Sequence, residues 1–530
     1  MGGDRLASLL LFVITSAPLL AAVPFPTQDG PAHLYTAHVS QALGDASNAA
    51  LLRRFFEPSS GAAATRVGTW MAQALGDWLG LALVPTVLMF AVVGGLFLVC
   101  SGGRAHRAPF FPRCFVPALA YCFVARMGFF SFCLALPFVV LSVRLWLGMG
   151  NDASHLRYAL FTGAMALIAL LHPFPALWVL VICVSASAAS LVLSRQHARV
   201  ELLWLAVAST PLVFLGSWHR STPAATYEWE RVATRLGGIL VGGPFAGSQS
   251  WSLVASSLSA ILLISLAVLA LRDQLPSRAP SDPYPFRLLA AVGAALLLAL
   301  LSPDAGLGGG YIGVRCQLLL FLLFLECGRR WQMTRRADIL LSVAVLGCSL
   351  ATVASTLVTL RTESAAYREI EASAAVLPHS TTVLTVMAGE WTASDSPDLT
   401  QQVRPLLHAG DLLGLSADRV MLANYQADLG YFAVSFRTTT TPFGVLFDRS
   451  LFDWGPPWIR WDRLPTFAGG VAHIGVWDED QLLRTIRNAP DYRRTICEHY
   501  EEIYRSPDWP WVIYRLSDKS QRKSTPTLCQ

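Results

Sequence analysis

The sequence predicts a mainly α-helical polytopic membrane protein: a bundle of about eleven transmembrane helices, followed by a C-terminal α/β domain outside the cytoplasm. Three observations support this fold class. Of the 530 residues, 54% are hydrophobic and only 14% are charged, which excludes a wholly soluble, disordered or fibrous chain. Long apolar runs recur throughout residues 1–360. From about residue 361 the pattern changes to β-rich runs separated by helix-like stretches.

Eleven apolar segments are candidates for membrane-spanning helices, which need about 20 residues, or fewer where neighbouring helices shield them. The first segment follows Asp4 and Arg5. We interpret it as an uncleaved first span, although the small residues Ala17, Ala21 and Ala22 would also suit a signal peptide. The segments are 6–23, 79–100, 114–125, 127–147, 158–171, 174–193, 202–218, 253–271, 288–301, 312–326 and 339–360.

The stretch 114–147 decides the topology, because it forms either one long helix or two helices that turn at residues 126–128. With two helices, the segments assigned to the cytoplasm are rich in arginine and the longer outer loops hold fewer, as the positive-inside rule requires. One helix would instead place Arg195, Arg199 and the arginines of 329–336 outside. We therefore predict two helices and a cytoplasmic N-terminus. The outer side then holds the loop 26–78, the turn at His172, the loops 219–252 and 302–317, and the C-terminal tail.

The tail carries both strand and helix patterns. Strands are expected at Thr381–Val386, Val471–Trp477 and Trp511–Leu516, and helices at 363–376, 400–413 and 479–488. We therefore divide the chain into a transmembrane domain, residues 1–360, which includes the first outer loop 26–78, and an extracytoplasmic α/β domain, residues 361–530.

Charge and cysteine spacing exclude two kinds of site. The net charge is +5, and Lys519 and Lys523 are the only lysines, so no polybasic tract suits nucleic acid. Most of the ten cysteines lie in or beside apolar stretches, without CxxC or Cys/His spacing, where they act as small apolar side chains. We predict neither a disulfide framework nor a zinc site. Only Cys497 and Cys529 lie in the polar tail.

Asp29 is the first candidate functional residue. Pro24 and Pro26 end the first span, and the Asp29-Gly30-Pro31 turn starts a short helix that carries His33. The ordinary interpretation is that Asp29 forms the turn or caps that helix. The functional interpretation is that Asp29 and His33 share one helical face, which suits proton transfer or metal binding.

Arg126, His172 and Arg315 are the other candidates, all predicted on the outer side. An arginine near hydrocarbon commonly snorkels to the interface, and a histidine in a turn is commonly solvated. Their functional alternative is to bind the phosphate of a lipid, because a guanidinium presents a rigid fork of donors.

These features resemble the GT-C superfamily of integral membrane glycosyltransferases, which use polyprenyl-phosphate sugars. The resemblance consists of an N-terminal span, a long outer loop that opens with Gln28-Asp29-Gly30, about ten further spans and an outer C-terminal domain. The string Asp-Gly-Pro-Ala-His-Leu, residues 29–34, also resembles one in uncharacterised bacterial multispanning proteins of this kind.

The resemblance implies hexosyl or pentosyl transfer, with inversion, at the outer face of a bacterial inner membrane. The donor would be a polyprenyl-phosphate sugar, the acceptor a glycan, lipid or protein, and Asp29 the general base. Arg315, Arg126 and His172, in falling order, would stabilise the leaving phosphate, and His33 would contact substrate. Many such enzymes carry paired acidic residues in this loop, whereas Asp29 follows Gln28. A divalent metal ion, held by Asp29 and His33, therefore stays an open question.

Two other classes of function fit the sequence. A polymerase or lipid-linked sugar flippase of surface-polysaccharide assembly would also need arginine on the outer face, but should carry more polar residues within its spans. A non-catalytic membrane scaffold would use the tail for interactions and would tolerate the loss of Asp29.

Overall fold

The structure is a computed structural model. It describes residues 2–45, 49–59, 63–101, 109–149, 154–191, 195–218, 231–245, 250–274, 284–304, 310–329, 334–388, 403–429, 432–447, 459–485, 489–517 and 526–529. The predicted outer loops 219–252 and 302–317 therefore lie partly outside the described residues.

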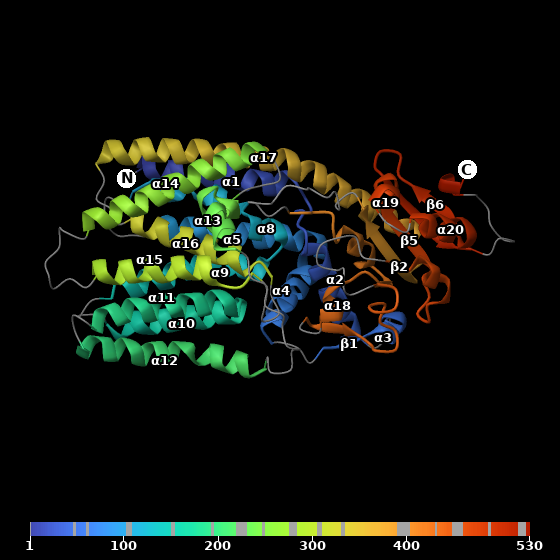
Figure 1. The fold of residues 1–530 in the computed structure, drawn as a ribbon, viewed down its shortest axis with the longest axis horizontal. Helices are drawn as coiled ribbons and strands as arrows, with labels where there is room; N and C mark the ends of the chain where they lie inside the picture. The colour runs from blue at the N-terminus through green and yellow to red at the C-terminus, as the bar shows by residue number, and fades with distance from the viewer. Residues whose placement is uncertain are drawn as a thin grey trace. The chain divides into compact units, whose positions relative to one another are not determined.

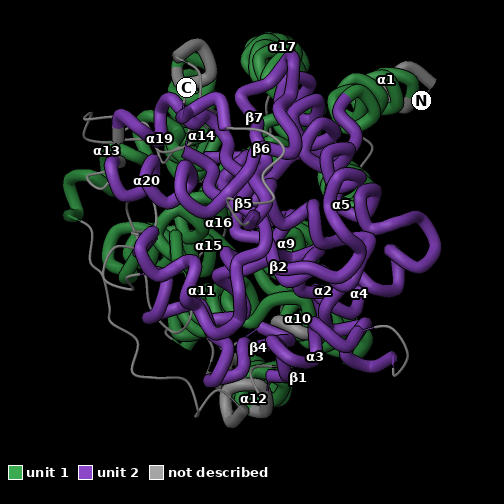
Figure 2. The backbone as a smooth tube through the Cα atoms, turned by 90° about the vertical axis from the view of Figure 1, so that its right-hand side faces the viewer, with its two compact units in different colours: residues 1–21, 86–359, 397–403 green, residues 22–85, 360–396, 404–530 purple. Residues whose placement is uncertain are grey.

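The chain forms two compact units, coloured green and purple in Figure 2. Unit 1 comprises Met1–Ala21, Thr86–Thr359 and Pro397–Val403. Unit 2 comprises Ala22–Pro85, Leu360–Ser396 and Arg404–Gln530.

This division differs from the predicted one, because the first outer loop packs with the C-terminal region. Strand β1 (Phe56–Pro58) pairs antiparallel with β4 (Val434–Phe436). Helix α2 (Gly30–Gly44) contributes Tyr35 and Val39 to the apolar core that the C-terminal strands build. The physical reason is burial: the loop has an apolar face of its own, and the C-terminal sheet covers it.

Unit 1 is helical. Ten of the eleven predicted segments each correspond to one long helix. These are α1 (Gly2–Ala21), α5 (Val84–Ser101), α9 (Phe130–Leu147), α10 (His155–Leu171), α11 (Pro173–Leu191), α12 (Arg195–Trp218), α14 (Ser250–Gln274), α15 (Tyr284–Leu301), α16 (Ile312–Arg329) and α17 (Arg335–Ser373), whose last residues belong to unit 2. Among the described residues, six helices are long and apolar enough to cross a membrane. The total of eleven spans stays a prediction.

The expected helix over 114–125 is wrong. Three short helices stand there instead: α6 (Phe111–Cys114), α7 (Val116–Ala120) and α8 (Phe123–Met127). Pro112 and Pro117 lie in the first turns of α6 and α7, where the missing N–H of proline is tolerated but an earlier helix cannot continue. Gly128, with φ of +90°, then ends α8 before α9 begins. The predicted break between two helices is present, but it lies at Gly128 and Phe129, whereas Arg126 and Met127 still belong to α8.

Several charged side chains inside unit 1 are paired. Helices α10, α11 and α12 lie side by side, and α11 also packs on α15 (Figure 1). Arg287 of α15 lies 2.7 Å from Glu201 of α12, and both side chains are fully buried. Glu326 of α16 accepts hydrogen bonds from Arg144 and Arg329. Pairing of this kind lets ionised groups lie in an apolar bundle.

Unit 2 is built on a five-stranded sheet in the order β3-β2-β5-β7-β6. Strand β2 runs parallel to β3 and β5, and β7 runs antiparallel to β5 and β6. The strands are β2 (Ser380–Met387), β3 (Asp418–Met421), β5 (His473–Trp477), β6 (Tyr500–Arg505) and β7 (Trp511–Leu516). The three predicted strands are confirmed. Strands β3 and β6 were missed because one is short and the other carries adjacent glutamates.

The helices of unit 2 are mostly short. The predicted helix 363–376 is the end of α17 followed by η4 (Ala374–Val376), and the one at 479–488 is α19 (Glu479–Thr485). Within 403–413, the described part of the predicted helix 400–413, the helical segment is η6 (Ala409–Gly414). The others are α3 (Ala50–Phe55), α4 (Ala63–Leu79), η1 (Leu81–Leu83), α18 (Gln426–Leu429), η8 (Trp461–Thr466), α20 (Ala489–His499) and η10 (Thr527–Cys529).

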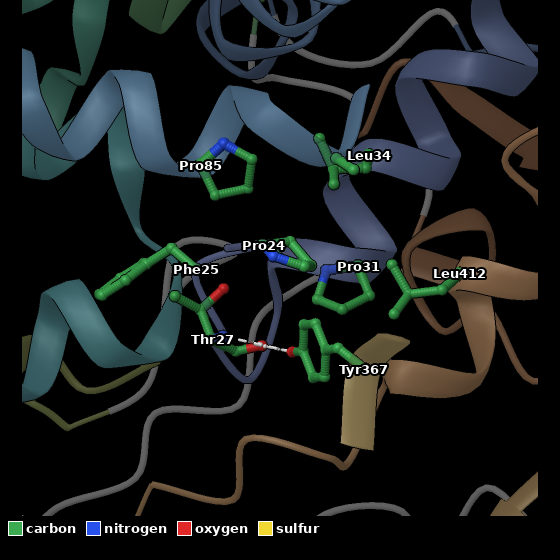
Figure 3. A pocket seen from close by; sticks show the side chains of 10 residues that line it. Pro24, Phe25, Thr27, Pro31, Leu34, Pro85, Tyr367 and Leu412 are labelled. Atoms are coloured by element: carbon green, nitrogen blue, oxygen red, sulfur yellow. Dashed lines mark hydrogen bonds between the residues drawn. The ribbon is translucent and has the colours of Figure 1, made fainter. Parts of the chain in front are cut away.

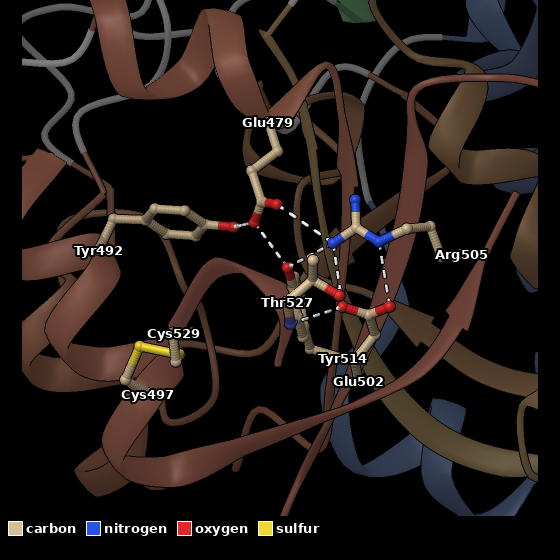
Figure 4. The surroundings of a disulfide bond; sticks show 8 residues. All are labelled: Glu479, Tyr492, Cys497, Glu502, Arg505, Tyr514, Thr527 and Cys529. Carbon is tan, nitrogen blue, oxygen red and sulfur yellow. Dashed lines mark hydrogen bonds and ion pairs between the residues drawn. A yellow bond between two sulfur atoms is a disulfide. The ribbon is translucent and has the colours of Figure 1, made fainter. Parts of the chain in front are cut away.

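Cys497 and Cys529 form a disulfide, which the sequence did not predict (Figure 4). Their Cα atoms are 5.7 Å apart, a usual separation for this bond. Beside it, Glu479 accepts a 2.6 Å hydrogen bond from each of the Tyr492 and Tyr514 hydroxyls. The spacing of the two cysteines carried no signal, because their proximity arises when α20 packs beside the C-terminal η10.

Candidate functional site

The turn that carries Asp29 is fixed by the C-terminal region of unit 2. The Thr27 N–H donates to the Tyr367 hydroxyl at 3.2 Å, and this hydroxyl lies 2.9 Å from the Pro405 carbonyl oxygen. Oε1 of Gln28 accepts the Arg404 N–H at 2.8 Å. The bonds of Thr27 and Gln28 join residues more than 300 positions apart and hold the backbone before Asp29 in one place.

Asp29 lies at the N-cap position of α2, but its carboxylate makes no capping hydrogen bond. The residue is 6% exposed. Its Oδ1 lies 3.6 Å from Nε2 of His408. The Asp29 side chain therefore does not cap α2, although capping was part of the ordinary interpretation of this residue. The buried carboxylate instead faces an imidazole.

His33 lies one turn into α2, where its backbone N–H donates to the Asp29 carbonyl at 3.0 Å. Its Nδ1 is 3.0 Å from the side-chain Nε2 of Gln426. Oε1 of the same glutamine accepts a 2.9 Å hydrogen bond from the Thr36 hydroxyl. Because Thr36 donates to the oxygen, the amide nitrogen of Gln426 faces His33 as a donor. Nδ1 of His33 is thus an acceptor, and burial lowers the pKa of its imidazole to about 4.

His408 completes this group. Its ring packs on that of Tyr425, with centroids 4.5 Å apart and the planes 30° apart. Burial, with a smaller effect from His33, lowers the pKa of His408 to about 3. Both imidazoles are therefore neutral near pH 7. We call Asp29, His33, His408, Tyr425 and Gln426 the Asp29 cluster.

A pocket runs along the turn that carries Asp29 (Figure 3). Its lining is apolar apart from Thr27 and Tyr367, whose hydrogen bond crosses it. The lining residues are Pro24, Phe25, Thr27, Gly30, Pro31, Leu34, Ala82, Pro85, Tyr367 and Leu412. Gly30 and Pro31, the two residues that follow Asp29 in the chain, thus line this pocket.

Unit 1 brings Arg315 and His172 together. Arg315, in α16, is 6% exposed, so it does not snorkel to solvent. Its guanidinium carbon lies 4.1 Å from the ring centre of Phe129 and 5.6 Å from that of Phe132. One terminal nitrogen is 3.4 Å from Nε2 of His172. The charge is therefore held by aromatic faces beside an imidazole.

The hydrogen-bond pattern of His172 indicates which ring nitrogen carries the hydrogen. His172 lies in the connection between α10 and α11, and its Nδ1 accepts the Phe174 N–H at 3.2 Å. Burial and the nearby Arg315 lower the pKa of His172 to about 3, so the ring is neutral. A neutral ring that accepts at Nδ1 carries its hydrogen on Nε2. The guanidinium of Arg315 and the imidazole of His172 therefore lie side by side, and an anionic oxygen between them can accept from both.

The predicted residues thus fall into two groups. Asp29 and His33 belong to unit 2, and Arg315 and His172 meet in unit 1. Arg126 lies in α8 of unit 1 and is 8% exposed, so it too is buried. Neither arginine follows the snorkelling interpretation.

No group of three or more His, Cys, Asp or Glu side chains with metal-binding geometry occurs in the described part of the chain. Nδ1 of His33 already accepts a hydrogen from Gln426. The two residues expected to hold a metal ion therefore offer at most Oδ atoms of Asp29 and Nε2 of His33.

Sequence reasoning missed His408, Tyr425 and Gln426 as members of the site. His408 lies 379 positions after Asp29 and stands in no motif. The stretch Asn424-Tyr425-Gln426 is aromatic and polar, and that is the one available signal.

Neither a family model nor a curated protein sequence matches this chain. Its structure is similar to that of ArnT from Cupriavidus metallidurans bound to undecaprenyl phosphate, with a TM-score of 0.54, 14% identity and coverage of 96% of this chain and 97% of ArnT. ArnT in the apo state gives a TM-score of 0.51 at 11% identity, covering 96% of both chains. ArnT has the GT-C fold. This chain has the GT-C fold.

The likeness extends over nearly the whole chain, so the GT-C fold includes both units and the C-terminal sheet. The archaeal oligosaccharyltransferase AglB from Archaeoglobus fulgidus, in complex with an inhibitory peptide and a dolichol-phosphate, gives a TM-score of 0.43 at 10% identity, covering 98% of this chain and 75% of AglB. The resemblance drawn from the sequence is confirmed for the fold. Together with the six long apolar helices, it makes the chain an integral membrane protein.

Proposed function

We propose that this protein is a membrane glycosyltransferase that moves a sugar from a polyprenyl-phosphate donor to an acceptor at the outer face of the bacterial inner membrane. The observation that carries the proposal is the buried Asp29 carboxylate, which faces His408 instead of capping its helix. The GT-C fold supports it, since ArnT with the same fold binds undecaprenyl phosphate. The acceptor is a glycan, a lipid or a protein.

Asp29 acts as the general base. It takes the proton from an acceptor hydroxyl, whose oxygen forms a bond to the anomeric carbon of the donor sugar. The bond between that carbon and the phosphate oxygen breaks, and polyprenyl phosphate leaves with the electron pair. Attack opposite to the leaving group inverts the anomeric centre. A positioned base contributes about 10²- to 10⁴-fold to such a step.

Arg315 and His172 stabilise the negative charge on the departing phosphate. Their adjacent N–H groups offer an oxygen both hydrogen bonds and the charge of the guanidinium. The aromatic rings beside Arg315 exclude water, which strengthens the electrostatic attraction. Arg126 is a second, weaker source of positive charge, and His33 contacts substrate beside the base.

The disulfide supports the sidedness of the reaction. Disulfides persist in oxidising compartments such as the bacterial periplasm and are rare in the cytosol. Because Cys497 and Cys529 belong to unit 2, together with Asp29, the proposed base lies on the outer side. The N-terminus is then cytoplasmic and the C-terminal region extracytoplasmic.

The test uses the purified full-length chain in lipid nanodiscs with a panel of undecaprenyl-phosphate hexoses and pentoses. Release of undecaprenyl phosphate is measured in the presence of solubilised membrane glycan, lipid and protein acceptors. Asp29→Asn should lower kcat by about 100-fold or more. Asp45→Asn is the matched control, because Asp45 lies exposed at the other end of α2. It should turn over like wild type.

The outcomes separate the candidate functions. Full turnover by the Asp29→Asn variant would remove Asp29 from the mechanism. Donor binding without transfer in wild type, for every donor and acceptor, would favour the flippase or scaffold. Repeating the assay with EDTA and then Mn²⁺ tests the metal ion: loss and recovery of turnover would show that the reaction needs one.

A further inference from the structure

The Asp29 cluster draws three of its five members from the C-terminal region of unit 2. His408 comes from the turn before η6, Tyr425 directly precedes α18, and Gln426 is the first residue of α18. The bonds that hold the turn before Asp29 come from Tyr367 and Arg404 instead. His408 and Gln426 contact Asp29 and His33, and Tyr425 packs on His408.

We propose that His408 is a positioning residue, whose Nε2–H holds the Asp29 carboxylate in the orientation in which it accepts the proton of the acceptor hydroxyl. This inference rests on the proposed function. Nε2 of His408 is the ring nitrogen that faces the carboxylate, at 3.6 Å from Oδ1. This distance is slightly longer than a hydrogen bond, and catalytic hydrogen bonds are often longer in unliganded enzymes than in their substrate complexes.

The chemistry of the pair fixes the tautomer. His408 is neutral near pH 7, so it carries one ring hydrogen. A lone pair on Nε2 would face the lone pairs of the carboxylate, whereas a hydrogen there is attracted to them. The neutral ring therefore places its hydrogen on Nε2. A neutral donor orients the carboxylate without forming a full ion pair that would suppress its basicity.

The surroundings hold the imidazole in this orientation. Its ring lies 4.5 Å from the ring of Tyr425. The Tyr425 hydroxyl lies 3.4 Å from Nε2 of Gln426, which also reaches Nδ1 of His33 at 3.0 Å. Gln426 is in turn fixed by the Thr36 hydroxyl. Ring packing and hydrogen bonds thus connect both imidazoles to one glutamine, and they preorganise the base before substrate arrives.

Two substitutions separate positioning from mere packing. The amide nitrogen of glutamine reaches the place of the imidazole Nε2, whereas that of asparagine reaches the place of Nδ1. Both substitutions remove the ring that packs on Tyr425, so their effects on folding are matched. His408→Gln should keep kcat within about 3-fold of wild type. His408→Asn should lower kcat by about 10- to 100-fold, the effect of losing a hydrogen bond to a charged group, with donor KM within about 2-fold.

Equal loss in the two variants, or full activity in both, would overturn the positioning role. Thermal unfolding of each variant checks that neither has simply failed to fold. The proposed function is tested separately by wild type and Asp29→Asn, so its failure is recognised before the His408 variants are compared.

A measurement without turnover tests the tautomer directly. In full-length protein labelled with ¹⁵N and ¹³C at histidine, in nanodiscs, the His408 signal is the one lost in the His408→Gln variant. We expect a neutral ring with its hydrogen on Nε2. A hydrogen on Nδ1 would overturn the inference even if no sugar donor were turned over.

Discussion

Asp411→Asn should make the stability of the chain less sensitive to pH. Asp411 lies in η6, is 3% exposed, and accepts a 3.0 Å hydrogen bond from the side-chain amide of Asn424. Burial raises the pKa of its carboxyl group from 3.8 to about 7. Asn424 also accepts the Ala427 N–H at 3.1 Å and so caps α18, which carries Gln426. Asp411 therefore supports the Asp29 cluster without belonging to it.

The sign follows from proton linkage. Between about pH 4 and pH 7 the folded chain keeps the Asp411 proton, whereas the unfolded chain has lost it. The folded state binds more protons, so the contribution of Asp411 to the free energy of unfolding falls as pH rises through this range. It is constant above about pH 7, where both states are ionised. Asparagine preserves the acceptor for Asn424 but does not titrate.

The magnitude follows from the two pKa values. Each tenfold change in an ionisation constant is worth about 1.4 kcal/mol. The rise from 3.8 to about 7 therefore corresponds to roughly 4 kcal/mol over the whole range. Between about pH 5 and pH 8, the variant should gain roughly 3 kcal/mol relative to wild type. The new amide N–H₂ adds a pH-independent offset of about 1–3 kcal/mol if it finds no acceptor.

The assay is urea unfolding of the detergent-solubilised full chain, followed by tryptophan fluorescence at several pH values. The quantity of interest is the difference in the free energy of unfolding between variant and wild type. Buried His33, His408 and His473 also titrate, but they do so in both proteins and cancel in the difference. A difference that stays constant from pH 5 to pH 8, or that moves toward wild type, would refute the reasoning.

Three further predictions concern contacts between residues of the same unit. Replacing Cys497 and Cys529 by serine should lower the free energy of unfolding by about 2–4 kcal/mol. Dithiothreitol should cause the same loss in wild type but none in the serine variant. Equal sensitivity of both proteins to the reductant would contradict the prediction. Arg287→Leu should destabilise unit 1 by about 3–5 kcal/mol, because it leaves Glu201 charged and buried. Adding Glu201→Leu to the Arg287→Leu variant should restore most of the yield of folded protein, measured by size-exclusion chromatography. A lower yield in the double variant than in Arg287→Leu alone would contradict the pairing. Tyr367→Phe should lower the free energy of unfolding by about 1–3 kcal/mol, because it removes the partner of the Thr27 N–H. Thermal unfolding measures this loss, and an unchanged melting temperature would contradict it.

The sequence predicted much of the secondary structure, for reasons that individual segments illustrate. Helices α9, α11 and α15 follow from long apolar runs, and β7 from its β-branched and aromatic residues. The segment 114–125 shows the limit of apolar composition. It is as apolar as its neighbours, but Pro117 interrupts it, and the helix ends again before α8 begins at Phe123. Composition measures hydrophobicity and not whether the backbone can continue as one helix.

The candidate site could be predicted only in part. Asp29 was recognisable because a carboxylate follows a span within a turn of prolines and glycine, and that is a local property. Arg315 and His172 were recognisable as charged or titratable groups at the ends of apolar runs. That these two lie 3.4 Å apart, 143 positions apart in sequence, could not be read from either neighbourhood.

The sequence by itself determined that this is a membrane protein, where its apolar helices lie and which local turn presents a carboxylate. These properties depend on hydrophobicity and backbone preference within about twenty consecutive residues. Tertiary structure alone decided that the first outer loop packs with the C-terminal sheet, that Cys497 meets Cys529, and that His408 faces Asp29. These contacts join residues from 32 to more than 380 positions apart. They arise when apolar faces made by distant segments are buried together, and no local pattern records which faces will meet.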